Sequence, residues 1–209
     1  ELREELVAGT RNTYQAEKRY LTAGGTLVWG RLNVTRMPTD HDEGPVFLAL
    51  VEDITEGKAR EHELRLAAAV FEHTDEGMMV TDPEHRLVRV NPAFTRQTGY
   101  PAAEAVGRDP GELLHSGHHE PAFYRGIFQT IAERGHWHGE IVNRCRDGSL
   151  RTFRETISPV YDNAGRLTYY VATVTDISGQ KELEAARDRL LAILEATPDF
   201  IGVLTPEGQ

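Results

Sequence analysis

Five segments between residues 77 and 177 alternate hydrophobic and polar residues, which is the period of a β-strand. Three of them are long and follow one another closely: 136–146, 150–161 and 166–177. The turns between these three contain Asp-Gly and Asp-Asn-Ala-Gly, which suit hairpins of sequential antiparallel strands. The other two, 77–82 and 86–91, flank a Pro-Glu-His turn and predict a further hairpin.

The residues between that hairpin and the three long strands have helical spacing instead. Asn91 suits an N-cap, Pro92 a first helical turn and Gly99 a helix end. A longer helix is predicted to start at Pro121 and to end before Gly135. Two strands, several helices and three strands in this order predict an α+β fold, with a five-stranded antiparallel sheet, helices on one face and a pocket between them.

Two charged segments with one apolar stripe each, 58–73 and 179–197, predict amphipathic helices that join neighbouring units. The second has Leu183, Leu190 and Leu194 close to a heptad seam. We therefore expect this helix to pair with a second copy in a parallel homodimer. The alternative is a helix that packs on its own domain.

The chain repeats itself at an offset of 123 positions. Gly25-Thr26-Leu27 recurs as Gly148-Ser149-Leu150, and Asp53-Ile54-Thr55 recurs as Asp176-Ile177-Ser178. A period of this size indicates tandem domains. We divide the chain into the C-terminal half of a first unit, a complete unit, and a linker helix with the start of a third unit: residues 1–57, 58–178 and 179–209.

Composition narrows the class of protein. With 33 acidic and 23 basic residues the net charge is −10, which excludes a chain built to coat nucleic acid. No window approaches the roughly 18 apolar residues of a membrane span, and the first residues lack a signal peptide, so we expect a cytoplasmic protein without membrane insertion. The single cysteine, Cys145, excludes an internal disulfide, a cysteine-rich zinc site and a Cys-x-x-Cys-His haem attachment.

Three motifs in order, Asn91 to Tyr100, Asn143 to Gly148 and Asp176-Ile177-Ser178, resemble the PAS sensory domain family over residues 75–178. The resemblance implies a sensory module in a prokaryotic signalling protein whose output domain lies outside these residues. Candidate output domains are a histidine kinase, a cyclic-dinucleotide enzyme and a chemoreceptor. The implied relay positions are the two strand ends and the leucine seam: Asp53, Ile54, Asp176, Ile177, Leu183, Leu190 and Leu194.

Residues 137–144 are similar to the subgroup of this family that holds FAD, which implies redox or oxygen sensing through a flavin. That subgroup carries a tryptophan fifteen residues before the asparagine, and this chain has Phe128 there, which keeps an aromatic ring. The expected cofactor-binding residues are Phe94, Phe128, Trp137, Gly139, Ile141, Asn143 and Arg144.

Strand alternation supports this pocket from the residues themselves. Trp137, Ile141 and Asn143 share one face, and it is the more apolar face. An unpaired buried amide costs about 1–3 kcal/mol, and a flavin edge offers a carbonyl beside an N–H. Gly139 is expected to leave room for the ring, with Trp137 or Phe128 as flat contact area. The alternative is that Asn143 bonds neighbouring backbone in a cofactor-free module that dimerises and relays a signal.

The first unit differs at these positions. The same offset places Tyr14, Lys18 and Tyr20 at positions 137, 141 and 143. A purely structural sheet would not require this difference between two copies in one chain. It therefore favours a ligand in the complete unit.

Histidines offer the competing chemistry of a haem, metal or small-ligand sensor. His115, His118 and His119 lie in one loop, and His136 and His138 share a strand face that points away from the apolar side. We interpret the loop as solvated and assign no metal ligands. The sequence also lacks a phosphate-binding loop, a nucleophile elbow and kinase or zinc-protease motifs, so we assign no catalytic residues and expect no enzyme activity within these residues.

Overall fold

The structure is a computed structural model that describes residues 2–38 and 44–196. The chain divides into two compact units, residues 1–69 and 70–209, and each is described by itself. The predicted start of a third unit, residues 197–209, lies outside the described residues.

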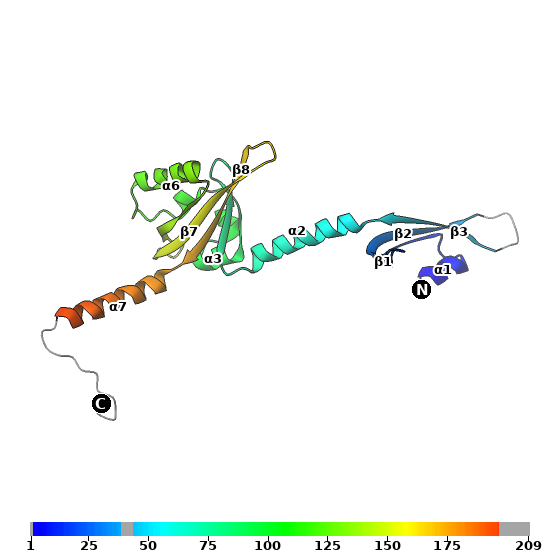
Figure 1. The fold of residues 1–209 in the computed structure, drawn as a ribbon, viewed down its shortest axis with the longest axis horizontal. Coiled ribbons are helices and arrows are strands. Elements are labelled where there is room, and N and C mark those ends of the chain that lie inside the picture. Colours follow the sequence, from blue (N-terminus) through cyan, green and yellow to red (C-terminus); the bar gives the residue numbers. More distant parts are fainter. Residues whose placement is uncertain (1, 39–43, 197–209) are drawn as a thin grey trace, which may run out of the picture. The chain divides into compact units, whose positions relative to one another are not determined.

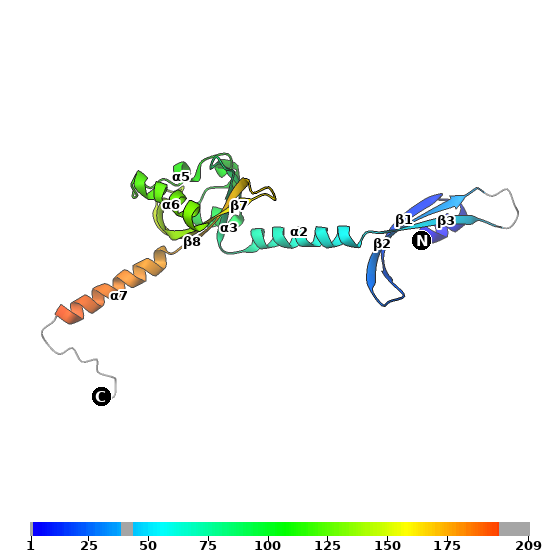
Figure 2. The ribbon, with the colours of Figure 1, turned by 45° about the horizontal axis from the view of Figure 1, so that its top comes forward.

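The complete unit is an antiparallel five-stranded sheet with helices on one face, which confirms the predicted α+β fold (Figures 1 and 2). Its strands are β4 Gly77–Thr81, β5 Leu87–Val90, β6 Trp137–Arg144, β7 Leu150–Tyr161 and β8 Leu167–Asp176. They lie in the order β5-β4-β8-β7-β6. The hairpins β4–β5, β6–β7 and β7–β8 follow from their local turns, whereas the pairing of β4 with β8 joins the two ends of the unit.

Four helices lie between β5 and β6: α3 Pro92–Thr98, α4 Ala102–Ala105, α5 Pro110–Leu113 and α6 Pro121–Arg134. The predicted caps of α3 are confirmed, because the Asn91 side chain accepts the amide of Phe94 and Gly99 has a φ of 80°. Gly135 has the same φ of 80° after α6. Glycine adopts this left-handed backbone without the clash of a Cβ, so both helices end where the sequence predicts.

Asn91 also holds the start of the unit together. Its Nδ2 donates to the carbonyls of Phe71 and Glu76 at 3.0 and 2.9 Å. Its Oδ1 accepts from the amides of Met78 and Phe94 at 2.8 and 2.9 Å. A buried asparagine with all these bonds formed fixes the preceding helix, β4 and α3 to one another.

Buried apolar side chains form two clusters between the helices and the sheet. The larger cluster includes Phe94 and Phe153, both 0% exposed. The smaller one consists of Ile127 and Ile131 from α6 with Ile141 from β6. Side chains of both clusters border the space between α6 and the sheet.

The first unit contains α1 Leu2–Ala8 and a three-stranded antiparallel sheet, β1 Thr13–Leu21, β2 Leu27–Met37 and β3 Val46–Asp53. Its pairs Tyr14–Val34 and Gly30–Asp53 correspond, 123 positions on, to Trp137–Ile157 and Phe153–Asp176 in the complete unit. The two sheets therefore share one register, as the sequence repeat predicts. The short helix α1, which the sequence pattern did not indicate, buries Leu6.

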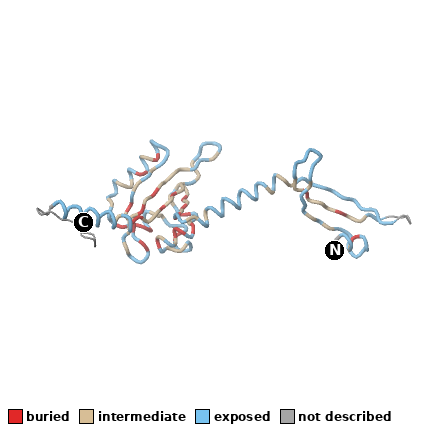
Figure 3. The backbone as a smooth tube through the Cα atoms, turned by 60° about the horizontal axis from the view of Figure 1, so that its bottom comes forward, coloured by how far each residue is buried: buried red, intermediate tan, exposed pale blue. Residues whose placement is uncertain are grey.

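One helix follows the last strand of each unit. These helices are α2 Thr55–His73 after β3 and α7 Ser178–Ala196 after β8. Figure 3 shows both as almost wholly exposed, in contrast to the buried positions of the complete unit. The leucines of the predicted seam, Leu183, Leu190 and Leu194, are 72%, 63% and 50% exposed. Among the described residues, no helix is long and apolar enough to cross a membrane.

Candidate functional site

A cavity of about 610 Å³ lies between the sheet, α5 and α6 of the complete unit. This volume falls within the range of about 300–1,000 Å³ that is usual for small-molecule sites. Its walls include the apolar side chains Met79, Leu114, Ile127, Ile141, Ile157 and Ala172. Polar and aromatic groups also line it, among them Asn143, Glu155, Tyr124, Phe128, Tyr170 and Arg125.

The polar centre of the cavity wall is a buried pair formed by Asn143 of β6 and Glu155 of β7. They are 7% and 3% exposed, and Asn143 Nδ2 donates to Glu155 Oε1 at 2.7 Å. Burial raises the pKa of Glu155 to about 7, although the hydrogen bond from Asn143 acts in the opposite direction. In the described part of the chain, no ion pair involves Glu155. This carboxyl can therefore exchange a proton near neutral pH.

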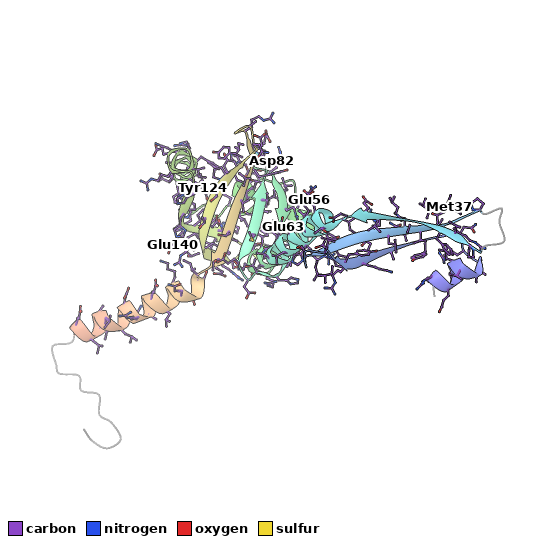
Figure 4. The ribbon with its side chains drawn as sticks, turned by 45° about the vertical axis from the view of Figure 1, so that its right-hand side comes forward. Met37, Glu56, Glu63, Asp82, Tyr124 and Glu140 are labelled. Carbon is purple, nitrogen blue, oxygen red and sulfur yellow. The ribbon has the colours of Figure 1, made fainter. Side chains whose placement is uncertain are left out.

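Tyr124 stands beside this pair. Figure 4 shows it on α6, and it lines the cavity. Burial and, to a smaller extent, the charge of Glu155 raise the pKa of its hydroxyl. Tyr124 therefore remains a neutral hydrogen-bonding group across the physiological pH range.

Three of the expected cofactor residues lie on the cavity wall: Phe128, Ile141 and Asn143. Phe128 is 40% exposed, and its ring lies 4.4 Å from that of His85, which also lines the cavity. Tyr170 contacts both rings, at centroid distances of 5.4 and 6.1 Å. Three aromatic rings, those of Phe128, His85 and Tyr170, thus stand together on the cavity wall, where Trp137 or Phe128 was expected to provide the flat contact area.

Trp137 and Gly139 require a correction. A Cβ on Gly139 would collide with the six-membered ring of Trp137, so the absent side chain makes room for the indole and not for a ligand. Trp137 packs against the smaller cluster below α6. Among the described cavity-lining residues, neither Trp137 nor Gly139 occurs.

Arg144 and Phe94 also differ from expectation. The guanidinium of Arg144 donates to the carbonyls of His115 and Ser116 at 3.3 and 3.0 Å, so it holds the loop between α5 and α6. Phe94 is a fully buried member of the larger cluster. Both residues support the walls of the site from behind and are not part of the described cavity lining.

The histidine loop is more ordered than the solvated loop that the sequence suggested. His119 Nε2 accepts the amide of Val142 at 2.9 Å, and its ring stacks on Phe123 at 4.1 Å. Burial lowers the pKa of His119, so it remains a neutral acceptor. This bond satisfies an amide on the open edge of β6, because β6 is the last strand of the sheet. No group of three metal-ligating side chains occurs in residues 2–38 and 44–196.

Two of the predicted relay positions, Asp176 and Ile177, form a cap with Ser178 where α7 leaves the sheet. Asp176 Oδ1 accepts the amide of Ser178 at 2.9 Å, and Asp176 Oδ2 pairs with Arg151 at 3.2 Å. Ile177 donates its amide to the carbonyl of Thr152, and Ser178 Oγ accepts the amide of Thr152.

The first unit repeats this cap. There Asp53 accepts the amide of Thr55 at 2.9 Å, and Ile54 donates its amide to the carbonyl of Trp29. Each cap fixes the start of a helix to the strand that precedes the last strand of its sheet, β2 in the first unit and β7 in the complete unit.

Glu155 and Arg125 are functional candidates that the sequence analysis missed. Glu155 shares one face of β7 with Phe153 and Ile157. The sequence pattern therefore predicts that it points inward, as a charged residue on an apolar strand face. Arg125 has no such signal, because it is one of many charged residues on exposed helix faces.

Comparisons with known proteins agree with this geometry. A family model described as "PAS fold" matches residues 66–177, and one described as "PAS domain" matches residues 1–56. The PAS domain of a protein from Colwellia psychrerythraea has a solved structure that matches with a TM-score of 0.53 at 20% identity, covering 56% of this chain and 98% of that one. That likeness shows the fold.

Three curated relatives are similar in sequence. Oxygen sensor protein DosP of Escherichia coli strain K12 is 29% identical over 195 residues, 93% of this chain and 24% of that protein. The nitrogen fixation regulatory protein of Klebsiella pneumoniae is 33% identical over 127 residues, 61% of this chain and 26% of that protein. A blue-light-activated histidine kinase of Brucella canis is 35% identical over 129 residues, 58% of this chain and 26% of the kinase. The chain thus spans about a quarter of the length of these relatives.

Proposed function

The chain belongs to the PAS family and is a sensory signal-transduction module, and from this premise we propose that its complete unit senses redox or oxygen status through a flavin. The observation that carries the proposal is the Asn143–Glu155 pair on the cavity wall. The side-chain amide of Asn143 donates one N–H to Glu155, and among the described residues no donor forms a hydrogen bond to its Oδ1. Asn143 Oδ1 is therefore left to accept from a ligand.

The chemistry of this pair matches the edge of an isoalloxazine ring. Asn143 presents an acceptor, and the protonated form of Glu155 presents an O–H donor beside it. A flavin edge carries the complementary N–H and carbonyl. The aliphatic walls of the cavity, with Met79 and Ile157 among them, suit the faces of a flat ring.

Other cavity residues suit the remaining parts of a phosphorylated flavin. Arg125 of α6 lines the cavity, and no ion pair engages it within the described residues, so it is available for an anionic group such as a phosphate of FAD. Phe128 and Tyr170 add aromatic surface. FAD is accordingly the flavin that we favour.

A bound flavin supplies reversible uptake of electrons and protons. The protein contributes a carboxyl with a pKa of about 7 in hydrogen-bond contact with Asn143. Glu155 would hold or release its proton according to the charge of a group bound beside it, and the Asn143–Glu155 bond would strengthen or weaken with that protonation state. The site thereby converts a redox change into a change of hydrogen bonding between β6 and β7.

The names of the relatives support a sensory role of this type. One relative is named an oxygen sensor and another a blue-light-activated kinase. We propose that this chain is part of a longer cytoplasmic protein in which the unit is not itself catalytic and controls an output domain such as a kinase or a cyclic-dinucleotide enzyme.

The test is an absorbance spectrum of protein purified without added cofactor, followed by heat release and chromatography of the chromophore. We expect oxidised-flavin bands, release of FAD, and loss of the flavin in Asn143→Ala. Asn163→Ala, on an exposed turn, is the matched control and should keep the flavin. A colourless protein that does not take up added FAD or FMN would contradict the proposal.

A second candidate function is supported by α7. Leu183, Leu190 and Leu194, with Ala186 and Ile193 beside them, lie close to heptad spacing on an exposed helix. This seam favours a homodimer in which the module relays a signal and sets the spacing of output domains. The two functions are compatible, and the flavin assay separates a sensing module from a module that only dimerises.

A further inference from the structure

A cluster of charged side chains joins the edge strand of the complete unit to the helix that leaves it. Glu140 lies on β6, where Figure 4 shows it on the side of the sheet from which α7 starts. Its Oε2 lies 2.8 Å from Lys181 Nζ in the first turn of α7, and its Oε1 lies 3.8 Å from Arg154 of β7. Glu184 lies 3.9 Å from the same lysine.

The first unit contains the same cluster. Glu17 of β1 lies 2.8 Å from Lys58 Nζ in α2 and 3.3 Å from Arg31 of β2. Glu61 lies 3.7 Å from Lys58. Two helices in two units are therefore tied to the corresponding strand by the same four residue types in the same arrangement.

The two copies have the same residues in the charged cluster but different residues at the cavity positions. At the offset of 123 positions all four charged residues are identical. Three cavity residues, Ile141, Asn143 and Glu155, correspond to Lys18, Tyr20 and Leu32. The two copies thus share the connection to the helix and differ in the chemistry of the pocket, which separates a common output element from a specialised input element.

We propose that the ion pair of Glu140 and Lys181 couples β6 to α7, so that a movement of β6 is transmitted to the helix that leaves the unit. Glu140 directly precedes Ile141, and neighbouring side chains of a strand point to opposite faces. A shift of β6 at the cavity therefore displaces Glu140 on the outer face. The source of that shift, a change at the cavity, rests on the function proposed above.

The coupling is distinct from the cap at the start of α7. Ile177 and Ser178 fix the helix to Thr152 of β7 through two hydrogen bonds, and Asp176 pairs with Arg151 of β7; none of these contacts involves a residue of β6. Loss of Lys181 therefore leaves α7 attached to β7 and removes its ion pair with β6. The lysine also holds the pKa of Glu140 below its ordinary value, so this pair stays charged at neutral pH.

Hydrogen–deuterium exchange measured by mass spectrometry tests the coupling on the whole chain. In Lys181→Gln we expect amides of β6 and of the first turn of α7 to exchange faster by about two-fold or more, because a surface ion pair contributes modestly. Lys181→Arg, which keeps a positive charge beside Glu140 and Glu184, should retain slow exchange. Rising salt should reduce the difference between wild type and Lys181→Gln by screening the pair.

Lys58→Gln is the matched control. It should speed exchange in β1 and the start of α2, and it should leave β6 and α7 unchanged. Unaltered exchange of β6 and α7 in Lys181→Gln, or exchange in Lys181→Arg as fast as in Lys181→Gln, would overturn the coupling. A thermal unfolding curve identifies any variant that has lost its fold, and Lys181→Arg then decides.

A second comparison separates this inference from the flavin proposal. In protein that carries flavin, reduction should change exchange in α7 of wild type and leave α7 of Lys181→Gln unaffected. An equal response in both would refute transmission through Glu140 and leave the flavin proposal intact. A protein without flavin would refute the sensing function, and the substitutions alone would still decide the coupling.

Discussion

The buried carboxyl of Glu155 gives the most specific quantitative prediction. Burial raises its pKa from an ordinary value of 4.5 to about 7, so the unfolded chain loses this proton at a lower pH than the folded protein. A tenfold difference in proton affinity between the two states corresponds to about 1.4 kcal/mol, so the ionised group costs the folded state about 3 kcal/mol above pH 7. Below pH 4.5 both states are protonated and the cost vanishes.

Glu155→Gln removes the titrating group and retains an oxygen to accept from Asn143. The free energy of unfolding of this variant, relative to wild type, should be close to zero below pH 4.5. It should then rise with pH and level off above about pH 7 at a gain of about 3 kcal/mol. Urea unfolding at closely spaced pH values measures this difference.

Glu140→Gln is the matched control, because Lys181 lowers the pKa of Glu140. Its ionised form stabilises the fold above the ordinary carboxyl pKa, and this contribution is lost as the pH falls through the lowered value. The Glu140→Gln variant should therefore be less stable than wild type near neutral pH, the opposite sign. A Glu155→Gln difference that does not vary with pH would refute the reasoning.

Three further predictions concern the fold and its assembly. Asn91→Ala should cost at least about 2 kcal/mol in urea unfolding, since it removes a helix cap and leaves buried backbone groups unpaired; a loss under about 0.5 kcal/mol would contradict that role. Gly139→Ala should cost about 1–3 kcal/mol because its Cβ meets the Trp137 ring, whereas Gly57→Ala in exposed α2 meets nothing and should stabilise by about 0.5–1 kcal/mol. Leu190→Asp should convert a dimer to a monomer in light scattering, and an unchanged mass would exclude the α7 seam as the contact.

Local features of this fold were predictable from the sequence. Strand 136–146 was predicted and Trp137–Arg144 is observed, because alternation along a strand depends on neighbours only. The caps Asn91 and Gly99 were predictable for the same reason, since each acts within one helical turn.

The contacts of the site depend on residues that are distant in sequence. Glu155, the partner of Asn143, lies twelve positions away on the next strand, and alternation cannot identify such a partner. Likewise, Trp137 turns over Gly139 on its own strand, and the guanidinium of Arg144 turns towards the loop that precedes α6. Side-chain direction of this kind is set by packing, which a periodic pattern does not contain.

The most direct test of the account is the visible absorption spectrum of the purified wild-type protein in air, after anaerobic reduction, and after readmission of air. We predict flavin bands that bleach on reduction and return on reoxidation, with the same behaviour weakened or lost in Asn143→Ala. A protein without such bands after incubation with excess FAD, or a flavin that Asn143→Ala binds as well as wild type does, would contradict the central claim.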